Sequence, residues 1–188
     1  HHTIGRRQRQ MCIRDSHHGW HTNPYIGREF HGIWGNFDVH IHLPEGYGIG
    51  ATGVKQSTTS SPMPTGLPGS IHHYKASNVI DFAWAADPDF IEEAVDVDGV
   101  TLRLIHQANA EIDSNWTVLA DYAAQAMAYM NEDIGPYMYP EYTVIQGGDG
   151  GMEYPMITFN GGERSLSRLF GVTVHEMAHS WFQGMVAT

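Results

Sequence analysis

The spacing of apolar residues changes near residue 109, and this change limits the possible fold more than any other feature of the sequence. Before it, Phe37–Leu43 alternates apolar and polar side chains, which is typical of a strand with one buried face. After it, apolar side chains recur every three or four residues, which is typical of a helix. We therefore expect an α+β chain, with an N-terminal antiparallel β-sheet domain at 17–108 and a second domain at 109–188.

Clusters of turn-forming residues divide the upstream part into short expected strands. Alternating or apolar runs predict strands at 37–43, 79–84 and 100–105. The segment 50–70 is rich in Gly, Ser, Thr and Pro, which indicates a loop. Asp87–Phe90 has the composition of a turn.

Downstream of residue 109 the pattern predicts two helices around two short strands. The first helix is expected to begin after an N-cap at Ser114 or Asn115 and to end at Gly135. Three further elements are expected, namely strands at 142–146 and 156–159, separated by a glycine-rich turn, and a helix at 165–184.

The first sixteen residues fit neither pattern. They hold four of the ten basic residues and the only cysteine, Cys12, and they lack the apolar stretch of a signal peptide. We therefore interpret 1–16 as a non-native or disordered leader. Because Cys12 is the only cysteine, the chain cannot form an internal disulfide. At the other end, the chain stops four residues after Gly184, and from this we expect a fragment of a longer protein.

The net charge excludes one large class of partner. Asp and Glu outnumber Lys and Arg by 21 to 10, a formal net charge of −11, so most of the surface would repel a phosphate backbone. We expect no nucleic-acid partner. The sequence has no run of about 18 apolar residues, so no membrane span is expected either. The compartment stays open, and a periplasmic or secreted location is compatible with the sequence.

The residues with the clearest chemistry form the motif His175-Glu176-Met177-Ala178-His179. On a helix, side chains four residues apart lie on one face about 5 to 6 Å apart, so both imidazoles can bind one zinc ion. Zinc lowers the pKa of a bound water to about 7, and Glu176 can accept its proton as the water attacks a peptide carbonyl. His175 and His179 are therefore the expected Zn²⁺ ligands, and Glu176 is the expected general base. The alternative is an ordinary core helix that happens to contain two histidines.

A glycine-rich segment precedes this motif. Gly148-Asp149-Gly150-Gly151 is followed directly by Met152 and Glu153. Glycines let a backbone approach a ligand closely, and a carboxylate just beyond them could bind a cationic amine. The alternative is a plain glycine-rich turn between two strands. A phosphate-binding loop is excluded, because no Gly-Lys-Ser or Gly-Lys-Thr follows.

Together the two segments resemble a known family. Gly-Gly-Met-Glu-Tyr at 150–154, about twenty residues before His-Glu-Met-Ala-His, is similar to the paired signatures of the aminopeptidase-N-like gluzincin zinc metallopeptidases, Gly-x-Met-Glu-Asn and His-Glu-x-x-His. Upstream, segment 74–87 is similar to the end of that family's N-terminal β domain. The resemblance covers most of residues 30–188, and it implies that 109–188 is the first part of a thermolysin-like α/β zincin catalytic domain.

The resemblance also implies a function, which is removal of N-terminal residues from peptides with a free N-terminus by attack of a zinc-bound water. The implied roles are zinc ligation by His175 and His179, general-base action by Glu176, binding of the substrate α-amine by Glu153, and lining of the scissile peptide by the backbone of Gly151 and Met152. In the family a third zinc ligand, a Glu, follows the second histidine after eighteen residues, and an oxyanion-stabilising Tyr comes later. Both would lie beyond Thr188, so the chain alone is not expected to hydrolyse peptides efficiently.

One departure from the family pattern keeps alternatives open. Tyr154 stands where the family has Asn, which makes exopeptidase action less secure than zinc-dependent hydrolysis. The alternatives are a zinc endopeptidase of the same superfamily and a non-catalytic scaffold with the same fold.

Other polar clusters are given structural interpretations. His40 and His42 share one strand face and could bind a metal, but a solvated strand face is the preferred interpretation. Adjacent histidines should point to opposite faces of an extended chain, which applies to His72-His73 and His17-His18. The acidic residues at 92–98 (Glu92, Glu93, Asp96 and Asp98) are interpreted as an exposed acidic edge and not as a calcium site, because the EF-hand order is absent.

Overall fold

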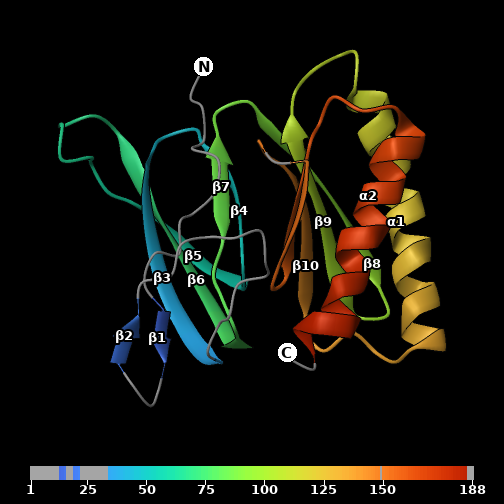
Figure 1. Ribbon diagram of the computed structural model, residues 1–188. Helices are drawn as coiled ribbons and strands as arrows, with labels where there is room; N and C mark the ends of the chain where they lie inside the picture. The colour runs from blue at the N-terminus through green and yellow to red at the C-terminus, as the bar shows by residue number, and fades with distance from the viewer. Residues whose placement is uncertain (1–12, 16–18, 22–33, 149, 186–188) are drawn as a thin grey trace.

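The computed structural model describes residues 13–15, 19–21, 34–148 and 150–185 (Figure 1). Over these residues the chain is mixed α+β, with mostly β-structure and two α-helices, which confirms the expected α+β class. β1 (Ile13–Asp15) and β2 (Gly19–His21) form a small antiparallel pair. The predictions for Cys12, His17, His18 and most of the leader lie outside the described residues.

An antiparallel three-stranded sheet forms the first large unit. Its strand order is β3 (Gly35–Pro44), β6 (Gly69–Val79) and β5 (Val54–Ser60). In β3, Val39, Ile41 and Leu43 pack in an apolar cluster with Tyr74, while the side chains between them lie on the opposite, more exposed face. The predicted strand at 37–43 is confirmed.

The prediction of a loop over 50–70 is wrong, because β5 occupies the middle of this segment. Its residues after Val54 are exposed Lys, Gln, Ser and Thr side chains, so neither face carries the apolar alternation that marks a half-buried strand. β5 lies at the edge of its sheet, where β-branched polar residues such as Thr are well tolerated.

The predicted strand at 79–84 is also wrong. β6 ends at Val79, and the next strand begins only at Trp84. The chain turns between them, because Asn78 takes a left-handed φ of 56° and the Asp81 carboxylate accepts a hydrogen bond from the Phe82 N–H at 2.7 Å.

β4 (Gly48–Ala51) and β7 (Trp84–Asp87) form a two-stranded antiparallel sheet between the larger parts (Figure 1). It packs against a five-stranded sheet so closely that a Cβ at Gly50 would lie 2.9 Å from both Ile105 and Ile145. The turn expected after β7 is confirmed, since Asp87 Oδ1 accepts a hydrogen bond from the Asp89 N–H at 2.8 Å.

The five-stranded sheet positions the candidate site. Its strand order is β11 (Gly151–Tyr154), β12 (Ile157–Asn160), β10 (Glu141–Gln146), β9 (Val100–Gln107) and β8 (Phe90–Val97). β10 runs parallel to both neighbours, whereas β8 and β11 are antiparallel edge strands. The strands expected at 100–105, 142–146 and 156–159 are confirmed to within two residues at each end. β8 and β11 were not predicted.

Two helices lie side by side on one face of this sheet (Figure 1). They are α1 (Asp113–Asp133) and α2 (Leu166–His179), and α2 continues into a π-helical turn at Ser180–Gly184. The shared core includes Trp116, Leu119 and Met127 of α1, Leu169 and Met177 of α2, and Leu102, Leu104, Tyr142 and Val144 of the sheet. The expected N-cap is wrong, because α1 begins at Asp113 and both Ser114 and Asn115 lie inside the helix. Asp113 Oδ1 accepts a hydrogen bond from the Asn109 N–H at 2.8 Å. In the described part of the chain, neither helix has the length and hydrophobicity to cross a membrane.

Strand pairing crosses the domain boundary that the sequence suggests at 108–109. β8 and β9 precede that position, yet they belong to the same sheet as β10, β11 and β12. The chain changes sheets between Asp87 and Phe90 instead. The change in the spacing of apolar residues marks the start of α1. The spacing of apolar residues depends on local secondary structure, and it does not show which strands pair.

Most of the acidic edge expected at 92–98 lies on strand β8. Glu92, however, forms an ion pair with a buried arginine. Arg103, which is buried, donates to Glu92 at 2.7 and 2.8 Å and to Glu141 at 2.9 Å. Burial alone would lower the pKa of Arg103, but the hydrogen bonds and charges of the two carboxylates raise it above its usual value. A permanent cation therefore joins β8, β9 and β10.

Candidate metal centre

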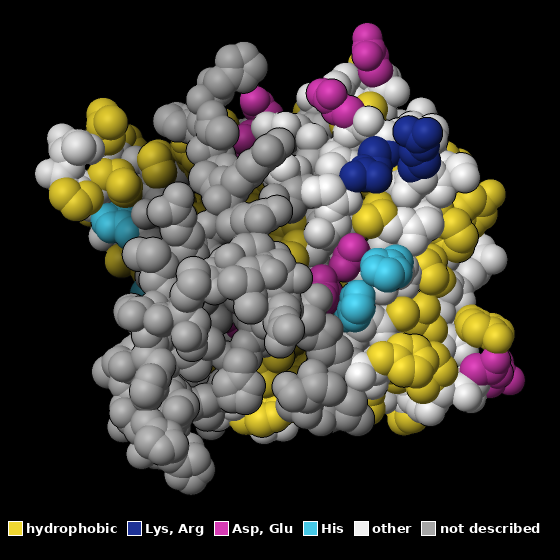
Figure 2. All heavy atoms as spheres, viewed as in Figure 1, with side chains coloured by type: hydrophobic (Ala, Val, Ile, Leu, Met, Phe, Trp, Pro, Cys, Tyr) yellow, Lys and Arg dark blue, Asp and Glu magenta, His cyan; other side chains and the backbone are white. Residues whose placement is uncertain are grey.

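Helix α2 holds the two histidines of the motif one turn apart. His175 Nε2 and His179 Nε2 are 3.4 Å apart, and the rings meet nearly at right angles with centroids separated by 4.9 Å. Zinc with nitrogen ligands at about 2.0–2.1 Å in tetrahedral geometry separates those nitrogens by about 3.4 Å. The spacing of the two nitrogens therefore fits a zinc ion. Figure 2 shows histidine and carboxylate side chains close together near the middle of the molecular face in view.

The opposite face of α2 anchors the motif. Thr173 is buried, its hydroxyl donates to the Leu169 carbonyl at 2.8 Å, and it accepts a hydrogen bond from Asn160 Nδ2 at 2.8 Å. This contact ties α2 to β12. After His179 the backbone widens into the π-helical turn, and Trp181 Nε1 donates to the Gly135 carbonyl at 2.6 Å. Such turns are frequent at functional sites, and this one fixes the end of the motif.

Glu176 is buried against the start of β11. A Cβ at Gly151 would overlap Glu176 Oε1 and lie 2.8 Å from Val172 Cγ2. Glu176 itself is only 6% exposed. The Glu176 carboxylate therefore packs directly against the Gly151 backbone, where any side chain larger than that of glycine would overlap it. The glycine-rich segment and the His-Glu-x-x-His motif, which the sequence analysis identified separately, are in contact here.

A Gly151→Ala variant is expected to destabilise the fold by about 1–3 kcal/mol, because the added methyl group must displace Glu176 or Val172. Urea denaturation of the purified chain measures the change. The matched control is Gly171→Ala on α2, where a Cβ meets nothing within 4 Å. Alanine there should raise stability by about 0.5–1 kcal/mol, because glycine is a poor helix residue. Equal stability of the two variants would contradict the contact.

Glu153 lies on β11 and lines the same small cavity as His179. Glu153 is half-buried and pairs with Thr158 of β12. The cavity has a volume of about 40 Å³. Its wall also includes Trp34, Ile80, Tyr139, Tyr154, Pro155, Met156, Ser180 and Gly184. The structure thus places the expected amine-binding residue, Glu153, in the same cavity wall as His179, one of the two expected metal ligands, together with aromatic and apolar side chains.

The backbone of Gly151 and Met152 lies at the sheet edge. β11 pairs with β12 on one side, and among the described residues no strand pairs with its other side. The Met152 carbonyl accepts a hydrogen bond from the Thr158 hydroxyl at 3.1 Å. An edge strand presents backbone N–H and C=O groups to an incoming chain, which suits these residues to line a peptide.

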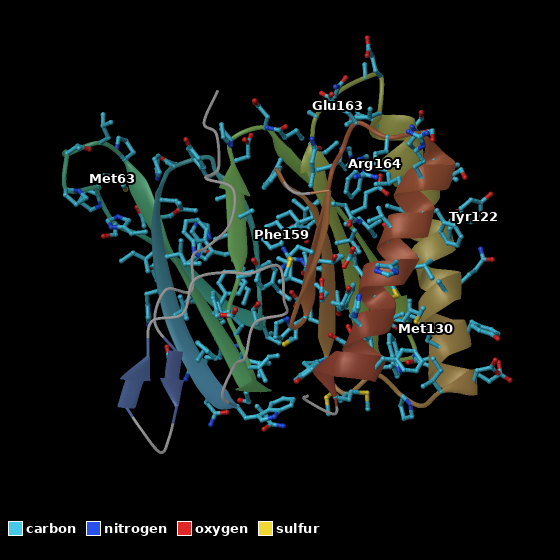
Figure 3. The ribbon with its side chains drawn as sticks, in the orientation of Figure 1. Met63, Tyr122, Met130, Phe159, Glu163 and Arg164 are labelled. Atoms are coloured by element: carbon cyan, nitrogen blue, oxygen red, sulfur yellow. The ribbon has the colours of Figure 1, made fainter. Side chains whose placement is uncertain are left out.

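The glycine run before β11 is held from both sides. Arg164 Nη2 donates to the Gly150 carbonyl at 2.7 Å, and a Cβ at Gly147 would lie 2.7 Å from Phe159. Figure 3 labels both Arg164 and Phe159. The expected glycine-rich turn is therefore present up to Gly148 and at Gly150, whereas Asp149 lies outside the described residues.

Tyr142 is a buried residue of the site that the sequence analysis did not identify. Burial raises the pKa of its phenol above the usual value; hydrogen bonds with Ser180 and Thr158 lower it, and the charges of Glu176 and Glu153 raise it. The Tyr142 hydroxyl therefore stays protonated, and it is close enough to both carboxylates for their charges to affect its pKa. In the sequence, Tyr142 begins an apolar run and resembles any residue of a core strand. Only the three-dimensional structure shows that it lies near Glu176 and Glu153.

Four other histidines lie on the paired strands β3 and β6. His72 is buried and His73 lies on the outer face, so the expected opposite orientation is confirmed. His42 Nε2 is 3.0 Å from the Ser61 carbonyl, which separates it from His40. His40 stacks on His73 instead, with ring centroids 4.1 Å apart.

Comparison with known proteins leaves the site to be judged on its geometry. No protein-family model matches the chain, and no curated protein matches it.

Proposed function

We propose that this chain carries metal-binding and catalytic residues of a zinc aminopeptidase of the aminopeptidase-N-like, thermolysin-like class. The supporting observation is the constellation on α2, where His175 and His179 present nitrogens 3.4 Å apart and Glu176 is held against Gly151. In this proposal 109–188 is the first part of the catalytic domain and 17–108 comes from the N-terminal β domain. β8 and β9 nevertheless pair with catalytic-domain strands.

His175 and His179 would supply two of the three protein ligands of a catalytic zinc site. When bound, zinc supplies Lewis-acid activation of a water and of the substrate carbonyl. Glu176 accepts a proton from the attacking water at its carboxylate and later returns it to the leaving amine. The rigid contact with Gly151 keeps that carboxylate in one place through both steps.

Glu153 would select substrates by their free N-terminus. Its carboxylate lies in the same cavity wall as His179, so it can bind an α-ammonium group while the first peptide bond reaches the metal. The edge of β11 would hold the substrate backbone beside it. Cleavage then follows the first residue, because the amine is fixed one residue from the metal.

A Glu153→Gln variant is expected to lower kcat/KM about 10- to 100-fold for peptides with a free α-amine, because a charge-assisted hydrogen bond is lost. Rates on N-acetylated versions of the same peptides should not fall. The assay uses the protein expressed with its complete reading frame. Glu163→Gln, an exposed carboxylate on the loop before α2, is the matched control and should leave both rates unchanged.

The same assay separates the alternatives. Equal loss on free and N-acetylated peptides would remove the assigned role of Glu153. Wild-type protein that cleaves N-acetylated peptides as fast as free ones is a zinc endopeptidase. Wild-type protein that binds zinc and cleaves neither is a non-catalytic scaffold.

A further inference from the structure

The outer face of the three-stranded sheet gathers a second set of metal-ligating side chains. In the β3–β6 register, His40 is directly opposite His73, and Asp38 is opposite Lys75. Asp38 and His40 lie two residues apart on β3 and therefore share a face. Strand pairing thus brings His73 to Asp38, which lies 35 residues earlier in the sequence, and to its neighbour His40.

Their ligand atoms converge. His73 Nε2 lies 2.7 Å and His40 Nε2 lies 3.4 Å from Asp38 Oδ1. Ligand atoms of the three residues all lie within 4.8 Å of one another. Side chains of Asp38 and His40 are 57% and 59% exposed, so a solvent ion can reach them.

We propose that Asp38, His40 and His73 form a divalent-metal site that binds Zn²⁺. Two imidazole nitrogens and one carboxylate oxygen are ligands that zinc favours, and the exposed side leaves a fourth position for water. The ion would replace the hydrogen-bonding proton between His73 and Asp38 and would join β3 to β6. This site is separate from the motif on α2 and does not depend on the peptidase proposal.

Two features should make the Zn²⁺ affinity of this site lower than that of the histidine pair on α2. The rings of His40 and His73 are stacked with 9° between their planes, so one ring must turn before both nitrogens can face one ion. Lys75 Nζ also lies 3.3 Å from Asp38 Oδ2 and competes for the carboxylate.

The test measures Zn²⁺ binding to the 188-residue chain in a His175→Ala/His179→Ala background, which silences the α2 pair. Calorimetry with Zn²⁺ alone should detect one equivalent that His73→Ala or Asp38→Asn weakens about 100-fold or more. The matched control is His42→Ala, which removes a histidine from the same strand face but outside the cluster. It should change the affinity by less than about twofold, as expected for a side chain that is not a ligand.

A fourth variant gives a change of opposite sign. Lys75→Met removes the competing ammonium group and should tighten Zn²⁺ binding, whereas a purely structural role of the cluster predicts no gain. Co²⁺ titration adds a spectroscopic check, since absorption bands of a nitrogen- and oxygen-ligated ion should disappear in His40→Ala. Equal binding by the His73→Ala and His42→Ala variants, or no effect of Asp38→Asn, would overturn the proposal.

Discussion

Replacement of Glu176 by glutamine is expected to leave zinc bound and to lower kcat about 100- to 10,000-fold, the range found when a general base is removed. Glutamine has the shape of glutamate and can occupy the space beside Gly151. Its amide cannot accept a proton at neutral pH, so proton transfer from the attacking water fails. The protein is expressed with its complete reading frame, and both peptide hydrolysis and zinc content are measured.

The control for this variant is Glu132→Gln, an exposed carboxylate on α1. It removes the same charge from the protein without touching the site, and its kcat should equal that of the wild type. A Glu176→Gln protein that retains full activity would exclude Glu176 as the base. Loss of zinc together with activity would instead make Glu176 a metal ligand or a residue needed for folding.

The second large effect is expected from His175→Ala. A structural zinc site contributes about 10–16 kcal/mol over four ligands, so loss of one ligand should weaken zinc binding about 100- to 1,000-fold. His175 is exposed, and alanine suits a helix, so the fold should not suffer. Competition with a chromophoric chelator measures the affinity of the 188-residue chain in the His73→Ala background, which isolates the α2 site from the sheet cluster.

Arg168→Ala supplies the control on the same helix. Arg168 is exposed and lies about two turns before His175, so its loss tests any general effect of changing the α2 surface. Zinc affinity should match that of the parent. If His175→Ala binds zinc as tightly as Arg168→Ala does, the two histidines do not share an ion.

The metal motif could be identified from the sequence because its geometry is local. His175 and His179 are four residues apart, and any regular helix brings such residues to one face. The second helix was predicted at 165–184, and α2 with its π-helical turn spans 166–184. The spacing of residues within this segment was therefore enough to predict both the helix and the placement of His175 and His179 on one of its faces.

The partners of this motif depend on contacts that are distant in the sequence. Gly151 was expected in a turn or near a ligand, and it begins β11 with Glu176 resting on it. A glycine carries no apolar side chain, so strand periodicity gives no signal there. Tyr142 was predicted to lie in a strand, but its closeness to Glu176 and Glu153 arises only when β10 and α2 pack together.

The cluster of Asp38, His40 and His73 shows the same limit. The sequence places His40 with His42, since residues two apart share a strand face. The structure selects His73 as its neighbour because β3 and β6 pair in one particular register. Register depends on the packing of whole strands, and a slip of one residue would send His73 to the other face.

The parallel pairing of β9 and β10 also affects how fast this chain can fold. β8 and β9 are joined only by Asp98–Gly99, both with positive φ, and hairpins of this kind close within about 1–10 μs. β10 can join β9 only after the crossover through α1, and such sequence-distant pairings form slowly. β12 also pairs with β10 in parallel, after the chain has passed through β11. The sheet that supports α2 therefore depends on pairings between segments that are distant in the sequence, and we expect it to assemble more slowly than the β8–β9 hairpin.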